Sequence, residues 1–163
     1  MPEAVEYRNA MSLLTSAVNV ITTAGEAGRY GFTASAVCSV TDSPPTLLVC
    51  MNQSVSSYAH FMENKIVAVN VLAAHQQAIA QAFAAKLTPA QRFAHGKWSM
   101  LETGAPILTD ALANFDCEIQ QIQDVGTHTI LLCRVVAVRC GEQEQSLVYF
   151  NRAYHPVGEL AFA

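Results

Sequence analysis

The chain has few charged residues and no long apolar run. Only 13% of its 163 residues are charged, and Lys and Arg occur singly, which excludes the basic stripe of a nucleic-acid-binding surface. No apolar run approaches the roughly 20 residues of a membrane span. The first ten residues lack the basic start and apolar core of an export signal. These absences predict a cytoplasmic protein without nucleic-acid or membrane partners.

Metal-binding and common catalytic signatures are also missing. The sequence has no CxxC, HExxH, GxGxxG, GxxxxGK[ST] or GxSxG, and its five histidines are never spaced as a metal pair. The five cysteines are an odd number and lie in apolar or alternating runs. We therefore expect small buried side chains and neither disulfides nor zinc ligands, with only Cys38 near a ligand. A hydrolase or metalloenzyme has no support, and no metal is expected.

Apolar residues make up 52% of the chain. They are enough to form a substantial core, and we expect one domain over residues 1–163. A single domain of this length with so few charges has little to keep its whole surface soluble. Burial of part of that surface against a second copy, in a homodimer, is therefore favoured.

Short alternating or apolar segments predict a mainly β fold with short helices, arranged as an antiparallel barrel. We expect strands at 18–24, 31–40, 46–52, 65–72, 111–121, 129–140 and 146–151. Helices are expected at 6–18, packed on the body, at 53–64, capped by Ser54 or Ser56, and at 73–86. Residues 87–110 read as a connecting segment or lid, and in 111–121 the alternation puts Phe115 and Cys117 inside and Asn114 and Asp116 outside.

The segment 31–40, "GFTASAVCSV", places short hydroxyl side chains on one face of its predicted strand: Thr33, Ser35 and Ser39. A flat ring could approach the backbone there, and hydroxyls and amides could bond its polar edge. The alternative is that these residues simply fill the solvent side of a hairpin, and composition alone leaves both open.

Three further segments could bind a ligand. Residues 52–57, "NQSVSS", lie where a predicted strand ends and a helix begins. The side-chain amide, the hydroxyls and the N–H groups of the helix could bind an anion there. The alternative is that one of the serines only caps the helix. His128 lies at a strand turn, where a histidine is usually incidental. Residues 151–157, "NRAYHPV", gather a cation and aromatics that could contact a phosphate or a ring, or only pin the C-terminal segment to the body.

In combination, "AVNVITT", "GFTASAVCSVTDSPPTLLVCMN", "VAVNVL", "GTH" and "LVYFNRAYHPV" occur in the order seen in one family. They resemble the flavin reductase component of two-component flavin-dependent monooxygenases, of the 4-hydroxyphenylacetate 3-monooxygenase reductase and pyrimidine-utilisation types. The resemblance implies a split β-barrel of the FMN-binding flavin reductase type and a homodimer. It also implies that NADH reduces FMN or FAD, and that the reduced flavin passes, by diffusion, to a separate oxygenase.

The resemblance also implies roles for particular residues. His128 matches the Gly-x-His turn beside the nicotinamide of NADH, although Thr127 stands where many relatives carry Asp, so an orienting carboxylate does not transfer. The cofactor-binding residues are those that border the flavin ring (Thr33, Ala34, Ser35, Cys38, Ser39, Val40, Thr41 and Pro45), those that hold its ribityl and phosphate groups (Asn52, Ser54 and Ser57), and two that approach it from the C-terminal segment (Arg152 and Tyr154).

The implied reaction moves a hydride from C4 of NADH to N5 of the flavin, so no catalytic acid or base is expected. The protein aligns two rings, which contributes on the order of 7–11 kcal/mol at most. Backbone N–H, Ser or Thr donors would stabilise the reduced ring at N1 and O2. The sequence does not decide whether the flavin is FMN or FAD. It also does not decide between NADH and NADPH, although the lack of clustered Arg residues leaves little to bind the 2′-phosphate of NADPH. Two other readings remain: a flavin-binding sensor or store without turnover, and a split barrel that binds haem, another ligand or only a partner chain.

Overall fold

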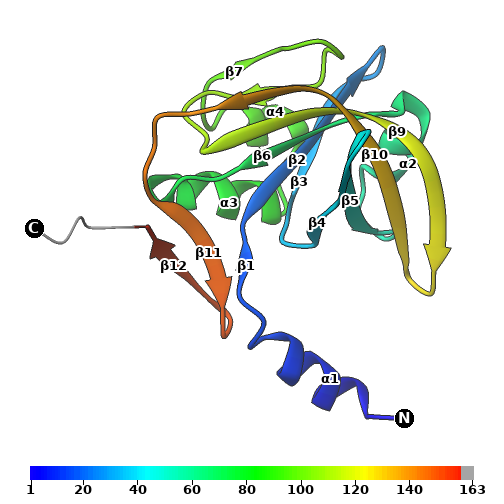
Figure 1. The fold of residues 1–163 in the computed structure, drawn as a ribbon, viewed down its shortest axis with the longest axis vertical. Helices are drawn as coiled ribbons and strands as arrows, with labels where there is room; N and C mark the ends of the chain where they lie inside the picture. Colours follow the sequence, from blue (N-terminus) through cyan, green and yellow to red (C-terminus); the bar gives the residue numbers. More distant parts are fainter. Residues whose placement is uncertain (159–163) are drawn as a thin grey trace, which may run out of the picture.

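The computed structural model describes residues 1–158, and its largest element is a curled antiparallel sheet (Figure 1). The order of its seven strands is β3-β2-β6-β9-β10-β5-β4. Their bounds are β2 (Asn19–Gly25), β3 (Gly28–Ala34), β4 (Val37–Asp42), β5 (Pro45–Asn52), β6 (Ile66–Val71), β9 (Ala113–Val125) and β10 (His128–Cys140). The last five residues of the domain predicted from the sequence lie outside the described part of the chain.

The two edge strands of this sheet follow each other directly in the chain. β3 ends at Ala34 and β4 begins at Val37, so Ser35 and Ala36 alone join one edge to the other. Such a short connection requires the sheet to curl until its edges meet, which makes a barrel that is open along the β3–β4 seam. The mainly β, split-barrel architecture predicted from the sequence is confirmed.

The prediction of one strand over residues 31–40 is wrong. The chain turns a corner at Ser35 and Ala36, and the corner changes which residues face inward. Phe32 is buried in β3, but in β4 it is Val37 that packs against the core, while Cys38 is exposed. The alternation in the sequence therefore does not describe a single two-faced strand.

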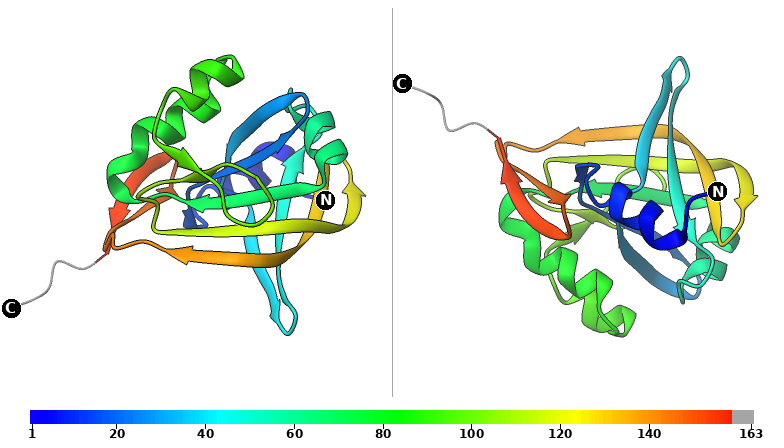
Figure 2. Two further views of the ribbon diagram at one scale, coloured as in Figure 1. Left: turned by 90° about the horizontal axis from the view of Figure 1, so that it is seen from above. Right: turned by 90° about the horizontal axis from the view of Figure 1, so that it is seen from below.

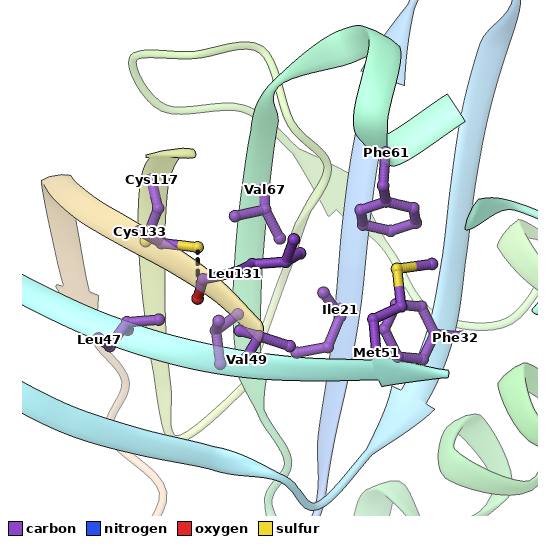
Figure 3. Packing of buried hydrophobic residues seen from close by; sticks show 11 residues of the cluster. Ile21, Phe32, Leu47, Val49, Met51, Phe61, Val67, Cys117, Leu131 and Cys133 are labelled. Atoms are coloured by element: carbon purple, nitrogen blue, oxygen red, sulfur yellow. Dashed lines mark hydrogen bonds between the residues drawn. The ribbon is translucent and has the colours of Figure 1, made fainter. Parts of the chain in front are cut away.

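The barrel interior is filled by aliphatic, aromatic and sulfur side chains (Figure 3). Residues of six strands meet Phe61 of helix α2 (Tyr58–Asn64), and the rings of Phe61 and Phe32 pack edge to face. A second apolar cluster lies between the sheet and the helices α3 (Gln77–Ala84) and α4 (Pro89–Phe93). The central strands β2 and β6 are consequently buried on both faces.

The helix predicted at 53–64 begins later than expected. Its N-cap position is Ser57, and no side chain caps it, so the expected capping by Ser54 or Ser56 does not occur. The helix predicted at 73–86 is present as the 3₁₀ turn η1 (Ala74–Gln76) followed by α3.

Residues 87–110, predicted to be a connecting segment or lid, connect α3 to β9 and are anchored in the core at residues 105–108. They contain α4 and two short paired strands, β7 (Trp98–Ser99) and β8 (Ile107–Leu108). Ile107 and Leu108 are fully buried, and the backbone N–H of Leu108 donates to the side chain of Asn70 at 2.8 Å. The segment therefore covers one side of the sheet as part of the core.

The expected outward face of β9 is also wrong, because Asn114 and Asp116 are both buried. The Asp116 carboxylate accepts hydrogen bonds from the N–H groups of Glu102 and Thr103, at 2.8 Å each, and from the Thr103 hydroxyl. Asn114 donates to Asn70 at 2.8 Å. Buried polar groups are tolerated when they are paired in this way.

Helix α1 (Ala4–Met11) does not pack as expected, since none of its residues is buried. Figure 1 shows it projecting from the body beside a separate sheet of β1 (Ser16–Ala17), β11 (Ser146–Phe150) and β12 (Ala153–Val157). In the described residues, no helix is long and apolar enough to cross a membrane.

Candidate functional site

A cavity of about 710 Å³ lies between α1 and the corner that joins β3 to β4. One wall is the corner itself, from Ser35 to Cys38, and another is the outer face of β5, at Leu48 and Cys50. The remaining walls come from α1 and the β11–β12 hairpin, through Arg8, Met11, Ser12, Leu14, Tyr149 and Arg152. The sequence analysis did not identify Arg8, because α1 was expected only to pack on the body.

A smaller cavity of about 150 Å³ adjoins the first, and the two share Ser35 and Tyr149. Its other lining residues include Thr33, Ala34 and Tyr154. The Thr33 hydroxyl donates to the backbone carbonyl of Ala80 at 2.6 Å, so only its oxygen lone pairs can serve a ligand. Among the residues expected to bind a cofactor, the two cavities bring together Thr33, Ala34, Ser35, Cys38, Arg152 and Tyr154.

The other residues expected near the ring lie further along the seam. Ser39, Val40, Thr41 and Pro45 are exposed on the β4–β5 hairpin, outside the lining of both cavities. Figure 2 shows this hairpin projecting from the body. They could contact only a ligand that extends out of the cavity along β4.

The outer face of β5 leads from the large cavity to His128. Leu48, Cys50 and Asn52 point to the same face, because alternate residues of a strand do. In the ladder with β10, their partners are Leu132, Ile130 and His128 respectively. The structure thus places His128 beside Asn52, at the end of this face, and not in the cavity lining itself.

His128 follows a two-residue turn between β9 and β10. Gly126, the first turn residue, has φ +57°, a conformation that suits glycine. The hydroxyl of Thr127 lies 2.9 Å from Nδ1 of the exposed His128 ring. A hydroxyl can donate to this nitrogen or accept from it, so the contact orients the ring in either tautomer.

The segment Asn52–Ser57 is compact and rich in polar groups. Asn52 Oδ1 accepts from the backbone N–H of Ser54 at 2.9 Å and from its hydroxyl at 2.8 Å. Ser57 is buried, and its hydroxyl has no hydrogen-bond partner. A buried hydroxyl without a partner is unfavourable, and an acceptor such as a phosphate oxygen would satisfy it.

The electrostatics of the large cavity favour an anion. Arg8 and Arg152 line it and no acidic side chain does, so its field is positive. Arg152 sits in a tight turn with φ +61° and donates to Asn9 Oδ1 at 2.8 Å. The turn is fastened to the end of α1 by a bond of 2.7 Å from the Asn151 N–H to the Ser12 carbonyl. These contacts hold both cations on one side of the cavity.

The cysteines divide between core and surface, and all five are free. Cys117 and Cys133 are buried, as predicted, but Cys38 and Cys140 are exposed. Burial, and then the neighbouring Cys38, raise the pKa of the Cys50 thiol. The cavity wall therefore presents Cys50 as a neutral, apolar group at neutral pH, which suits the face of an aromatic ring.

The geometry describes a binding site and contains no acid–base machinery. Apolar walls, neutral hydroxyls and two arginines suit a planar ring that carries a phosphate. Within residues 1–158, no group of three or more His, Cys, Asp or Glu side chains could hold a metal ion. A split barrel with such a site defines the class of flavin-binding oxidoreductases, in which the cofactor supplies the reactivity.

Comparisons with known proteins identify the family. The flavin reductase like domain matches residues 11–158, and the chain belongs to this family. An FMN reductase (NADH), RutF, of Pantoea ananatis is 54% identical over 95% of this chain and 82% of its own length. The RutF of Acinetobacter baylyi is 53% identical over 91% of this chain and 79% of its own length.

Solved structures agree with this assignment. A protein of Haemophilus somnus 129PT assigned as a flavin reductase superposes with a TM-score of 0.94 and 51% identity, over 96% of this chain and all of that one. The NADH:FAD oxidoreductase SgcE6 of Streptomyces globisporus, in complex with NAD and FAD fragments, gives a TM-score of 0.89 at 26% identity, over 98% and 96% of the two chains. BorF, the flavin reductase component of a bacterial two-component tryptophan halogenase, gives 0.88 at 28% identity, over 96% and 99%.

Proposed function

We propose that the protein is an NADH-dependent flavin reductase that uses FMN. The observation that carries this proposal is the 54% identity, over 95% of the chain, to an FMN reductase (NADH). The cavity at the β3–β4 corner, with apolar walls and with Arg8 and Arg152 on one side, suits the ring of a flavin. When bound, FMN accepts a hydride at N5 from C4 of NADH.

The residues of this chain would bind and orient the two ligands. Thr33, Ala34, Ser35 and Cys38 are proposed to border the flavin ring, with Ser39, Val40, Thr41 and Pro45 continuing along the seam. Asn52, Ser54 and Ser57 would hold the ribityl and phosphate groups. Arg152 and Tyr154 would approach the flavin from β11–β12, with Arg8 as an added contact from α1, and His128 would contact the nicotinamide.

The test follows NADH oxidation by the purified protein. We expect loss of the nicotinamide absorbance band only when flavin is added, faster with FMN than with FAD and faster with NADH than with NADPH. A tightly bound yellow cofactor without turnover would favour a sensor or store. A colourless protein that oxidises no NADH under any of these conditions would refute the proposal.

A homodimer is proposed because the single chain exposes many large apolar side chains. On α1 and the residues after it, the exposed fractions of Leu13 and Leu14 are 59% and 62%, and on β10 that of Val138 is 53%. Large apolar side chains that are exposed close together in the chain, as on α1 and the residues after it, are typical of an interface. A second copy that covers these faces would explain it, and sedimentation of wild type against Val138→Asp tests it: the wild type should sediment as a dimer.

The reduced flavin is proposed to pass to an oxygenase component by diffusion. Structural neighbours of this chain include BorF, the flavin reductase component of a bacterial two-component tryptophan halogenase, and the styrene monooxygenase flavin reductase of Pseudomonas putida S12. An oxygenase separated from the reductase by a dialysis membrane should still oxidise its substrate. If the separated oxygenase were inactive, the reduced flavin would have to pass by direct contact between the two proteins. Five free cysteines fit the reducing cytoplasm, which is the proposed location.

A further inference from the structure

A buried hydroxyl lies under the turn that carries His128. Thr129, the second residue of β10, has no exposed surface. Its Oγ1 donates to Asp124 Oδ1 at 2.7 Å, lies 2.8 Å from the hydroxyl of Tyr58, and accepts from Gln53 Nε2 at 3.3 Å. A hydroxyl has one proton and two lone pairs. Since the proton goes to Asp124, Tyr58 must donate, and all three bonding positions of Thr129 are used.

These bonds join two segments that are far apart in the sequence. Asp124 and Thr129 flank the turn with Gly126, Thr127 and His128, whereas Gln53 and Tyr58 flank the segment Ser54–Ser57. Two further contacts connect the same parts. The backbone N–H of Gln53 donates to the Thr127 carbonyl at 3.0 Å, and its Nε2 lies 3.3 Å from the His128 carbonyl. The His128 turn and the Asn52–Ser57 segment are therefore held as one unit.

We propose that Thr129 is a positioning residue, which fixes the His128 turn relative to the Asn52–Ser57 segment without touching either ligand. This inference rests on the proposed function, in which His128 serves NADH and Asn52–Ser57 serves the flavin. The spacing of the two ligands then depends on a hydroxyl that neither ligand contacts. Gln53 contributes through the same unit, because it bonds the Thr129 hydroxyl and the carbonyls of Thr127 and His128.

The test compares Thr129→Val with a matched control, Thr23→Val. Both threonines are fully buried, and the Thr23 hydroxyl donates to the Ile66 carbonyl at 2.7 Å, away from the His128 turn. Valine keeps the volume and removes the hydroxyl. In Thr129→Val we expect kcat/KM for NADH to fall by at least about tenfold, with the FMN dissociation constant changed less, since small misplacements are costly in hydride transfer. Thr129→Ser should restore the rate, and Thr23→Val should leave it unchanged.

Hydrogen exchange gives a readout that does not depend on activity. The Gln53 amide and the amides of residues 126–128 should exchange faster in Thr129→Val, but not in Thr23→Val. Gln53→Leu, at an exposed position, should show a smaller increase in the exchange of the same amides. This variant replaces Thr129→Val in the test if Thr129→Val does not fold. Equal exchange and equal kcat/KM in the Thr129 and Thr23 variants would overturn the inference. A wild-type protein that oxidises no NADH would refute the proposed function, while faster exchange would still show that Thr129 fastens the two segments.

Discussion

Asn52 and His128 lie directly opposite each other in the ladder between β5 and β10. One belongs to the segment proposed for the flavin and the other to the turn proposed for NADH, so the ladder brings the two proposed binding regions together. The next residue, Gln53, fastens this pair to the turn through the Thr127 carbonyl.

His128→Ala should raise the KM for NADH about tenfold while the KM for FMN rises less. The loss removes one hydrogen bond to NADH, which is worth about 1.5 kcal/mol. Steady-state kinetics with each substrate varied in turn measures the difference. His75→Ala, an exposed histidine on η1, is the control and should change neither constant. A larger effect on FMN would assign the imidazole to the flavin.

Ser35→Tyr should weaken FMN binding at least about tenfold, because Ser35 lines both cavities and a phenol ring would fill them. Ser35 is exposed, so the fold should survive the change. Fluorescence titration of FMN gives the affinity. Ser39→Tyr tests whether the ring extends along β4 and should also weaken binding, whereas Ser43→Tyr at the hairpin tip should not. Unchanged affinity in Ser35→Tyr would remove the flavin from this cavity.

Arg152→Ala should weaken binding of FMN and of riboflavin alike, because Arg152 is proposed to approach the flavin in the cavity while the phosphate is assigned to Asn52, Ser54 and Ser57. A hydrogen bond from a cation is worth about 1.5–3 kcal/mol, or roughly tenfold to a hundredfold in affinity. Arg8→Ala should act in the same direction. The control is Arg134→Ala, whose side chain pairs with Glu118 on the surface at 3.3 Å. A loss for FMN with none for riboflavin would place the phosphate at the arginines and not at the segment Asn52–Ser57.

Asp116→Ala should lower the free energy of unfolding by about 2–4 kcal/mol, because the N–H groups of Glu102 and Thr103 lose their buried acceptor. Urea denaturation measures the change. Asp42→Ala, which removes an exposed carboxylate from the β4–β5 hairpin, should cost less stability. A negligible effect of Asp116→Ala would mean that the loop at 102–105 finds other acceptors.

The stability of the protein should fall at alkaline pH. Burial raises the pKa of Cys133 from 9.0 to about 12, and burial together with Cys133 and Asp116 raises the pKa of Cys117 as well. Above pH 9 the unfolded thiols lose protons that the folded thiols keep, so each thiol lowers the free energy of unfolding by about 1.4 kcal/mol per pH unit up to its folded pKa. Urea denaturation at a series of alkaline pH values measures this slope.

In Cys133→Ala the free energy of unfolding should fall less steeply with alkaline pH than in the wild type. In Cys140→Ala, which changes an exposed cysteine, it should fall as steeply as in the wild type. Equal slopes in wild type and both variants would show that the buried thiols do not govern the alkaline loss.

The sequence predicted most strands and the barrel because apolar alternation follows the backbone period directly. It could not show which polar residues are buried. Asn114 and Asp116 read as outward-facing, yet their partners Asn70 and Thr103 come from other segments, and only the folded chain brings them together. The corner at Ser35 and Ala36 was hidden for a similar reason, since the alternation continues through it in the sequence.

The candidate site was predicted in part. The segments that resemble the family contained Ser35, Cys38 and Arg152, which the structure places in one cavity. Arg8 was missed because a short amphipathic helix normally packs on its own domain, and α1 here does not. Thr129 was missed because one threonine in an apolar strand carries no signal without its partners.

The central claim is that this chain holds NADH and FMN together so that a hydride passes between them. Mixing the protein anaerobically with FMN and one equivalent of NADH, and following the flavin and nicotinamide absorbance together, tests it most directly. The account predicts that both bands bleach in one-to-one proportion, at a single rate far above that of the mixture without protein. Bleaching no faster than in the protein-free mixture would contradict it.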